Sequence, residues 1–387
     1  MNLLPIMSSK QRVHSVLEGK PVDRFPVTAI YNMLIYDDFF SKITGNSQAM
    51  LESWSSSKDP DSFLRCYRQM VETLPFEILQ PNPWAPNREW RETNEYVQKD
   101  AKPFRHNIKT GEWFPLEVTS SGHARDYHMN ETRNIQDKKD ADEKIKLFTA
   151  DQQIALGQSD WIDAVVSAYG KDNFILSGGV VGTFYLSGNH FGQTNVLSML
   201  REEPDLIEYV SKKVLEQNIE DIRRFARSGG DAIYIDDATT TNDMISVDDY
   251  ERFSLPYMKA MVDEIHRLGH KAILIYFGGV ADRLEQIAST GADGLVMEAS
   301  MKGFVNDIDD AVRRIGKKIT LFSNIDPIGV LQEGSDADVT AEITRQCAAG
   351  LKGRGMILSP ASPITPFTSI DRIKFFIDKA KEIGRSN

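Results

Sequence analysis

The pattern between Gly230 and Pro363 constrains the fold most strongly, because short apolar runs alternate there with amphipathic helices. Five such runs occur in order: DAIYIDDA, KAILIYFGG, DGLVMEAS, KITLFSNID and GMILSPAS. Apolar runs of this length are typical of strands in a parallel sheet that is buried on both faces. The C-terminal ends of parallel barrel strands meet on one face, where catalytic residues are found. The pattern therefore predicts both the fold and the place of the functional site.

Three earlier segments extend the set of predicted strands: FPVTAIY (25–31), FEILQP (76–81) and NFILSGGVVG (173–182). Together the segments number eight, as a closed (β/α)8 barrel requires. We therefore predict an α/β fold, a TIM barrel formed as a single domain over residues 1–387.

Residues 82–145 are too long for a plain connection after the second strand. Their sequence alternates around a turn at Lys109–Gly111, which predicts β-hairpins in this insertion. Because the insertion starts at the C-terminal end of a strand, we expect its aromatic residues to cap the active face. A hairpin with a small core of its own is the alternative.

Charge and composition exclude several classes of partner and compartment. The formal net charge is -11, which argues against nucleic acid or an anionic membrane as a partner. Two distant cysteines give neither a disulfide framework nor a metal motif. The apolar run at the N-terminus is too short for a signal peptide, and no segment approaches a membrane span. These features predict a cytoplasmic protein.

Four ordered segments carry a family resemblance. QRVHSVLEGKPVDRFPV contains the pattern Gly-x-Pro-x-Asp-Arg-x-Pro before the first strand, and ISVDDYERFSLPYMKAMVDEIHRLG, SNIDP and GMILSPASPITPFTSIDRI follow it. Together they resemble the uroporphyrinogen decarboxylase superfamily over nearly the whole chain, from Gln11 to Ala380. This resemblance implies the same barrel fold.

Two branches of the superfamily fit the sequence poorly. Porphyrinogen decarboxylases carry an arginine-rich motif after the first strand, whereas TAIYNMLIYDDFF has no arginine, and Asp37 and Asp38 would repel a substrate with many carboxylates. Thiol-methylating cobamide enzymes place zinc ligands where this chain has Ile275, Phe277 and Ser362. Without a zinc site that stabilises a thiolate, a thiol acceptor is not expected.

The remaining resemblance is to methyltransferases of corrinoid-dependent demethylation. It implies transfer of a methyl group from a small methoxylated, aromatic substrate to the cobalt of a separate corrinoid protein, with a homodimer as one candidate assembly. The departing oxygen must then be protonated or bound to a Lewis acid. Two alternatives remain open: a methylcorrinoid:tetrahydrofolate methyltransferase, and a non-catalytic barrel subunit.

Polar residues at the strand ends are the candidates for the chemistry. Of Asp236 and Asp237 only one should point into the barrel, and we select Asp237 as a general acid or metal ligand; the alternative is a carboxylate that caps its own loop. Glu298 ends an apolar run, where a raised pKa would suit a proton donor, unless it pairs with Lys302. Tyr276 is expected to bind a substrate oxygen or stack on an arene, or else simply to pack.

Further residues are expected to line the site. Gly278 and Gly279 would allow a large flat cofactor to approach the backbone. An oxygen-rich zinc site could use Asp237, Glu298 and His190; the alternative is no metal. Aromatic side chains at the strand ends and in the insertion are expected to contact the substrate: Tyr31, Trp84, Phe184, Tyr185 and Phe277.

Overall fold

The centre of the protein is a curled parallel sheet of seven strands, in the order β1-β5-β6-β7-β8-β9-β10. The computed structural model describes residues 5–100, 102–116, 132–300, 303–361 and 363–385. Seven of the eight predicted segments form these strands, which confirms the α/β class and the parallel order. Their bounds are β1 Ile78–Leu79, β5 Phe174–Val181, β6 Ala232–Asp237, β7 Lys271–Tyr276, β8 Gly294–Met297, β9 Thr320–Phe322 and β10 Met356–Ile357.

The eighth predicted segment, 25–31, joins the two edges of this sheet through a few backbone bonds. Val27 pairs with Leu358 next to β10 as an isolated parallel bridge, and its carbonyl accepts a hydrogen bond from the Glu77 N–H next to β1. Pro26 has no N–H to donate, and Tyr31 leaves the extended conformation, with φ 54°. The segment therefore bridges both edges without forming a regular strand.

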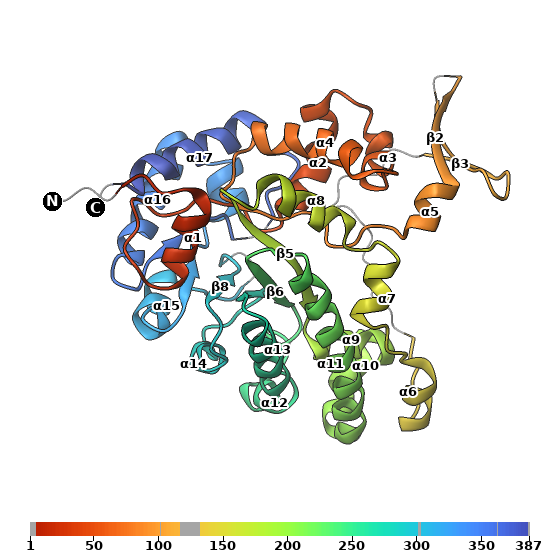
Figure 1. The fold of residues 1–387 in the computed structure, drawn as a ribbon. Coiled ribbons are helices and arrows are strands. Elements are labelled where there is room, and N and C mark those ends of the chain that lie inside the picture. Colours follow the sequence, from red (N-terminus) through yellow and green to blue (C-terminus); the bar gives the residue numbers. More distant parts are fainter. Residues whose placement is uncertain (1–4, 101, 117–131, 301–302, 362, 386–387) are drawn as a thin grey trace.

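Helices surround the sheet (Figure 1). Most begin at a residue whose side chain accepts a hydrogen bond from the first turn, such as Ser8, Asp59 and Ser335. The helices are α1 Ser9–Leu17, α2 Asn32–Thr44, α3 Leu51–Ser55, α4 Pro60–Thr73, α5 Arg88–Thr93, α6 Lys138–Lys144, α7 Ala150–Ala155, α8 Asp160–Tyr169, α9 Thr183–Phe191, α10 Gln193–Glu202, α11 Pro204–Arg227, α12 Val247–Phe253, α13 Leu255–Arg267, α14 Leu284–Ala288, α15 Ile308–Ile315, α16 Asp336–Gly350 and α17 Ile370–Ile383, with shorter turns at Gln48–Met50 and Pro327–Gln332. In the part of the chain that the structure describes, no helix is both long and apolar enough to cross a bilayer.

An ionic cluster and helix α1 hold the end of the sheet where the strands begin. Val16 of α1 packs among the inward side chains of the strands, and its carbonyl accepts a hydrogen bond from Thr320 Oγ1 at 2.9 Å. Arg12 and Arg24 both bind the buried Glu77 carboxylate. The site must therefore be sought at the opposite end, where the strands finish.

The segment after β1 forms a small antiparallel sheet. Its strands are β2 Asn94–Lys99, β3 Lys102–Asn107 and β4 Trp113–Pro115. The turn before β4 contains Gly111 at φ 77°, in the stretch predicted from the sequence. Figure 1 shows β2 and β3 projecting away from β5–β8, and the capping of the strand ends stays a prediction.

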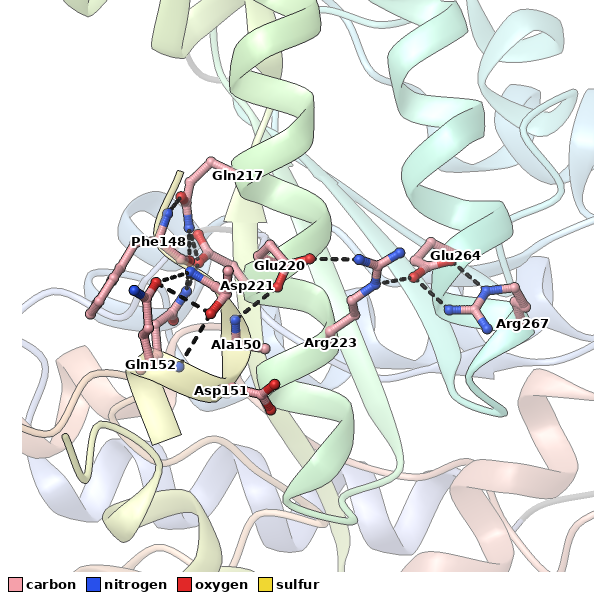
Figure 2. A network of polar contacts seen from close by, with 12 residues as sticks. Phe148, Ala150, Asp151, Gln152, Gln217, Glu220, Asp221, Arg223, Glu264 and Arg267 are labelled. Atoms are coloured by element: carbon pink, nitrogen blue, oxygen red, sulfur yellow. Dashed lines mark hydrogen bonds and ion pairs between the residues drawn. The ribbon is translucent and has the colours of Figure 1, made fainter. Parts of the chain in front are cut away.

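The return from this segment is fixed to helix α11 by a polar network (Figure 2). The Phe148 N–H donates to Gln217 Oε1, and the Ala150 N–H donates to Glu220 Oε2, both at 2.8 Å. Glu220 also binds Arg223, which binds Glu264 of α13. The chain that re-enters the barrel is therefore anchored on the outer helices.

Candidate functional site

Alternation along the strands divides their side chains into an inner and an outer set. One apolar cluster contains alternate residues of the strands together with helix α1; the other combines the intervening strand residues with the surrounding helices. The inner cluster contains Val13, Val16, Leu17, Ile30, Tyr31, Ile78, Phe174, Leu176, Ala232, Tyr234, Ile273, Ile275, Val296, Phe322 and Ile357. A polar residue in register with this cluster faces the barrel interior.

Asp236 is the carboxyl at the end of β6 that follows this inner register. Tyr31 donates a hydrogen bond from its hydroxyl to Asp236 Oδ2 at 2.6 Å. The Tyr31 ring stacks on Phe277 with centroids 5.6 Å apart, and meets the edge of Tyr234 at 5.7 Å. The structure thus brings together three aromatic rings and one carboxyl at the C-terminal ends of the strands.

Tyr31 is held in this place by an unusual backbone conformation. It has φ 54° and ψ 42° and immediately precedes helix α2. A bulky residue rarely adopts this left-handed region, and such residues occur often at functional sites. The next residue, Asn32, is buried; it donates to the Ile78 carbonyl at 2.7 Å and accepts from the Gln80 N–H at 3.1 Å. Asn32 therefore fixes the start of α2, and with it Tyr31, to strand β1.

The Asp236 side chain is partly exposed, but its Oδ1 atom is shielded from solvent and has no hydrogen-bond partner among the described residues. Desolvation raises the pKa of Asp236 from 3.8 to about 7; the Tyr31 hydrogen bond lowers it, and the charge of Asp237 raises it further. A carboxyl with this pKa is protonated in a substantial fraction of molecules near neutral pH. It can therefore donate a proton under conditions where an ordinary aspartate cannot.

Asp237, which we selected from the sequence, lies in the outer register. Its Oδ1 accepts hydrogen bonds from the N–H groups of Thr239 and Thr240 at 3.0 and 3.1 Å, and its Oδ2 accepts from Thr240 Oγ1 at 2.6 Å. It is fully buried, and desolvation raises its pKa against these hydrogen bonds. This geometry matches the loop-capping alternative, and Asp236 is the inward carboxyl of the pair.

Tyr276 also points outward. It is fully buried, and its hydroxyl lies 2.9 Å from the hydroxyl of Tyr250 on α12. Its placement matches the packing alternative rather than contact with a substrate.

Gly278 and Gly279 serve the packing of two loops. A Cβ at Gly278 would lie 2.4 Å from Thr241 Oγ1, and one at Gly279 would lie 2.0 Å from Asn242 Oδ1. Gly278 also has φ 149°. The loop after β6 occupies the space that we had assigned to a flat cofactor, because the missing side chains let the two loops meet directly.

Glu298 follows β8 and continues the inner register of Val296. It is 3% exposed, and its backbone carbonyl accepts a hydrogen bond from Asn306 Nδ2 at 3.0 Å. Lys302, its alternative partner, and Ser362 lie outside the described residues. Glu298 is therefore the second carboxyl that the inner register brings to the C-terminal ends of the strands.

Two of the remaining predicted residues, Trp84 and Phe184, lie away from this place. Trp84 is 44% exposed and packs outside the sheet on α11, with its ring 4.1 Å from the Arg224 guanidinium. Phe184 is buried in the outer cluster. Tyr185 is half-buried on helix α9.

His190 lies near the end of α9, and desolvation lowers its pKa. Within the ranges that the structure describes, no group of three or more His, Cys, Asp or Glu side chains could hold a metal ion. The set Asp237, Glu298 and His190 is therefore not assembled, since Asp237 faces the helices.

Sequence reasoning missed Gln80, which lies just beyond β1 in the inner register. It is 1% exposed and lies close enough to the Tyr234 phenol to lower its pKa, while desolvation dominates and raises it. A glutamine at the end of the apolar run FEILQ was the available signal. Buried amides need partners, as buried carboxyls do.

Comparison with known proteins gives the family. The uroporphyrinogen decarboxylase (URO-D) family profile matches residues 136–383. A uroporphyrinogen decarboxylase from Tolumonas auensis is 31% identical over 202 residues, covering 51% of this chain and 54% of that protein. The methylcobamide:CoM methyltransferase MtbA of Methanosarcina acetivorans is 26% identical over 216 residues, covering 55% of this chain and 59% of that protein. The chain thus spans little more than half the length of these relatives.

A solved structure shares the fold over a greater length. A methyltransferase from Methanosarcina mazei has a TM-score of 0.68 at 18% identity, covering 97% of this chain and 99% of that one. This likeness concerns the fold alone. The family profile covers well over half of the sequence, so the chain belongs to the uroporphyrinogen decarboxylase (URO-D) family.

Proposed function

We propose that this protein is a corrinoid-dependent methyltransferase that moves a methyl group from a methoxylated, aromatic substrate to the cobalt of a separate corrinoid protein. The observation that carries the proposal is Asp236, an inward carboxyl with a pKa of about 7, surrounded by the rings of Tyr31, Tyr234 and Phe277. Aromatic walls suit a planar substrate, and a carboxyl that holds its proton near pH 7 suits an oxygen leaving group.

In the proposed reaction the methyl carbon–oxygen bond breaks and its electron pair stays on oxygen. The partner's reduced cobalt supplies the electron pair of the new carbon–cobalt bond. The oxygen takes the proton of Asp236, so the alcohol or phenol leaves neutral and Asp236 becomes ionised. Solvent returns the proton before the next turnover.

The inward residues at and just after the end of β7 support an oxygen substrate over a thiol. Ile275 is buried in the inner cluster, and Phe277 packs against it. Neither side chain can bind zinc or stabilise a thiolate, although MtbA, by its name, methylates a thiol cofactor.

The relatives that are decarboxylases leave decarboxylation as the competing activity. The stretch 28–40, which follows the bridge at Val27, has no arginine and carries two aspartates. Asp38 is largely buried. A substrate with many carboxylates would therefore meet negative charge here and no arginine to bind it.

The test is a pair of half-reactions with the purified protein. In the first, a methoxylated arene is the donor and chemically reduced cobalamin is the acceptor, and loss of the Co(I) absorbance reports methyl transfer. In the second, methylcobalamin is the donor and tetrahydrofolate is the acceptor. Activity in the first reaction alone supports the proposal. Activity in the second alone would favour the tetrahydrofolate enzyme, and inactivity in both would favour a non-catalytic subunit or decarboxylation.

A further inference from the structure

The Gln80 side chain has an incompletely used hydrogen-bonding group in the barrel interior. It is 1% exposed, and one N–H of its Nε2 points to the Tyr234 hydroxyl, whose pKa it lowers, while the other N–H has no partner within the part of the chain that the structure describes. Its backbone N–H is used by Asn32, which fixes the residue at the end of β1. A buried N–H group left unpaired costs about 1–3 kcal/mol. Such groups in native proteins call for an explanation, and a ligand is one.

A second group in the same state lies nearby. Asp236 Oδ1 is also shielded and without a partner among the described residues. Both side chains flank Tyr234: Gln80 lies beside its phenol, and the charge of Asp236 acts on its pKa. Gly179 opposite has no side chain, and a Cβ there would lie 2.3 Å from the Tyr234 ring. The ring therefore packs directly on strand β5, with both Gln80 and Asp236 near its hydroxyl.

We propose that the Gln80 amide and the Asp236 carboxyl together form the subsite for one substrate oxygen, the oxygen that loses its methyl group. This inference rests on the proposed function and assigns Gln80 as a second hydrogen-bond donor to the departing oxygen. An ether oxygen has two lone pairs and no proton, so it accepts one bond from the amide N–H and one from the protonated carboxyl. When the carbon–oxygen bond breaks, both donors face the negative charge that develops on oxygen.

The same subsite holds the phenol product, with the direction of one hydrogen bond reversed. The phenol accepts from Gln80 as the ether did, and donates its own proton to ionised Asp236. The ether therefore binds the form of the protein in which Asp236 is protonated, and the phenol binds the ionised form. Gln80 does not titrate, so its contribution does not depend on pH.

Asp236 is bonded by Tyr31 from the start of α2 and lies near Tyr234 of β6, and both phenols are uncharged when protonated. Glu298, after β8, is the other carboxyl in the inner register. Asp237, its neighbour on β6, is the carboxyl whose charge raises the pKa of Asp236. Desolvation also raises the pKa of Tyr234, so this phenol stays neutral between pH 6 and 8.

The test measures binding of anisole and phenol to the whole protein at pH 6 and pH 8, by calorimetry, without cobalamin. With a pKa of about 7, the protonated fraction of Asp236 falls about tenfold over this range. We expect anisole affinity to fall by up to tenfold from pH 6 to pH 8 and phenol affinity to rise by a similar factor. Lack of binding by both compounds, or the same pH dependence for both, would overturn the inference.

Two variants separate the roles. Asp236→Asn should abolish the opposite pH dependences of the two ligands. Gln80→Met replaces the amide by a side chain of similar volume without an N–H donor. It should lower the affinity for both anisole and phenol about fivefold or more, and leave the midpoint of their pH dependences unchanged. Undiminished binding by a folded Gln80→Met protein would contradict the role of Gln80.

The outcome is distinguishable from failure of the proposed function. Opposite pH dependences of anisole and phenol binding, without any methyl transfer to cobalamin, would reject the proposed function and support the subsite. Methyl transfer that is as fast in the Gln80→Met variant as in the wild type, without opposite pH dependences of anisole and phenol binding, would reject the subsite and support the proposed function.

Discussion

Replacing Asp236 by asparagine should stabilise the protein at alkaline pH relative to acidic pH. In the folded protein the pKa of Asp236 is about 7, against 3.8 for an ordinary aspartate. The folded state therefore holds a proton that the unfolded chain has already lost between these two values. The stability contributed by the protonated carboxyl is fully present below pH 3.8, and is lost as pH rises through about 7. Asparagine has no such dependence.

The magnitude follows from the pKa difference of about 3 units, each worth about 1.4 kcal/mol, which gives an upper bound of about 4 kcal/mol. Most of this change in stability falls between pH 4.5 and pH 8. Because the side chain is partly exposed, solvent reduces the effect, and we expect about 2–3 kcal/mol.

The assay is urea unfolding of wild type and Asp236→Asn at pH 4.5 and pH 8. The difference in unfolding free energy between variant and wild type cancels the titrating groups that do not interact with Asp236. It should move in favour of the variant by about 2–3 kcal/mol on going to pH 8. Asp237→Asn is the matched control, because Asp237 accepts several hydrogen bonds and its replacement should destabilise the protein at both pH values. A difference for Asp236→Asn that stays constant between the two pH values would refute the buried-acid account.

Three further predictions concern neighbouring parts of the structure. Tyr31→Phe removes the hydrogen bond that lowers the pKa of Asp236. Since such a bond is worth about 1.5–3 kcal/mol, the pKa of Asp236, measured by carboxyl carbon NMR, should rise by about 1–2 units. An unchanged or lower pKa would contradict the contact. Glu77→Gln leaves two arginines without their shared buried partner. It should lower the unfolding free energy by about 3–5 kcal/mol in urea titrations. A loss below about 1 kcal/mol would show that the ionic cluster is not needed for stability. Gly279→Ala places a Cβ 2.0 Å from Asn242 Oδ1 and should destabilise by about 1–3 kcal/mol, measured in the same way; unchanged stability would mean that the two loops separate freely.

Much of the fold could be predicted from the sequence because its strands are continuous apolar runs. Seven of these runs became strands of the parallel sheet, since burial on both faces leaves a clear pattern. The segment 25–31 was harder, because Pro26 removes one backbone donor and Tyr31 turns out of the extended conformation. The bridge at Val27 depends on long-range partners that no local pattern encodes.

The site could be predicted only to the level of strand ends. Alternation predicted that one of Asp236 and Asp237 faces inward, but it could not say which, because a shift of one residue in register exchanges the two faces. Tyr276 and Trp84 carry aromatic rings near strand ends, yet each packs against a helix. Gln80 was missed because a lone glutamine has no spacing pattern; its importance comes from burial.

The most direct test of the central claim is the pH dependence of methyl transfer from a methoxylated arene to reduced cobalamin. If Asp236 is the proton donor, the wild-type rate is constant at low pH and falls above a single midpoint near pH 7, where Asp236 loses its proton. Asp236→Asn then reduces the rate by at least a hundredfold without a midpoint in this range. A wild-type rate that is independent of pH between 6 and 8, or an Asp236→Asn variant with the wild-type rate and midpoint, would contradict the account.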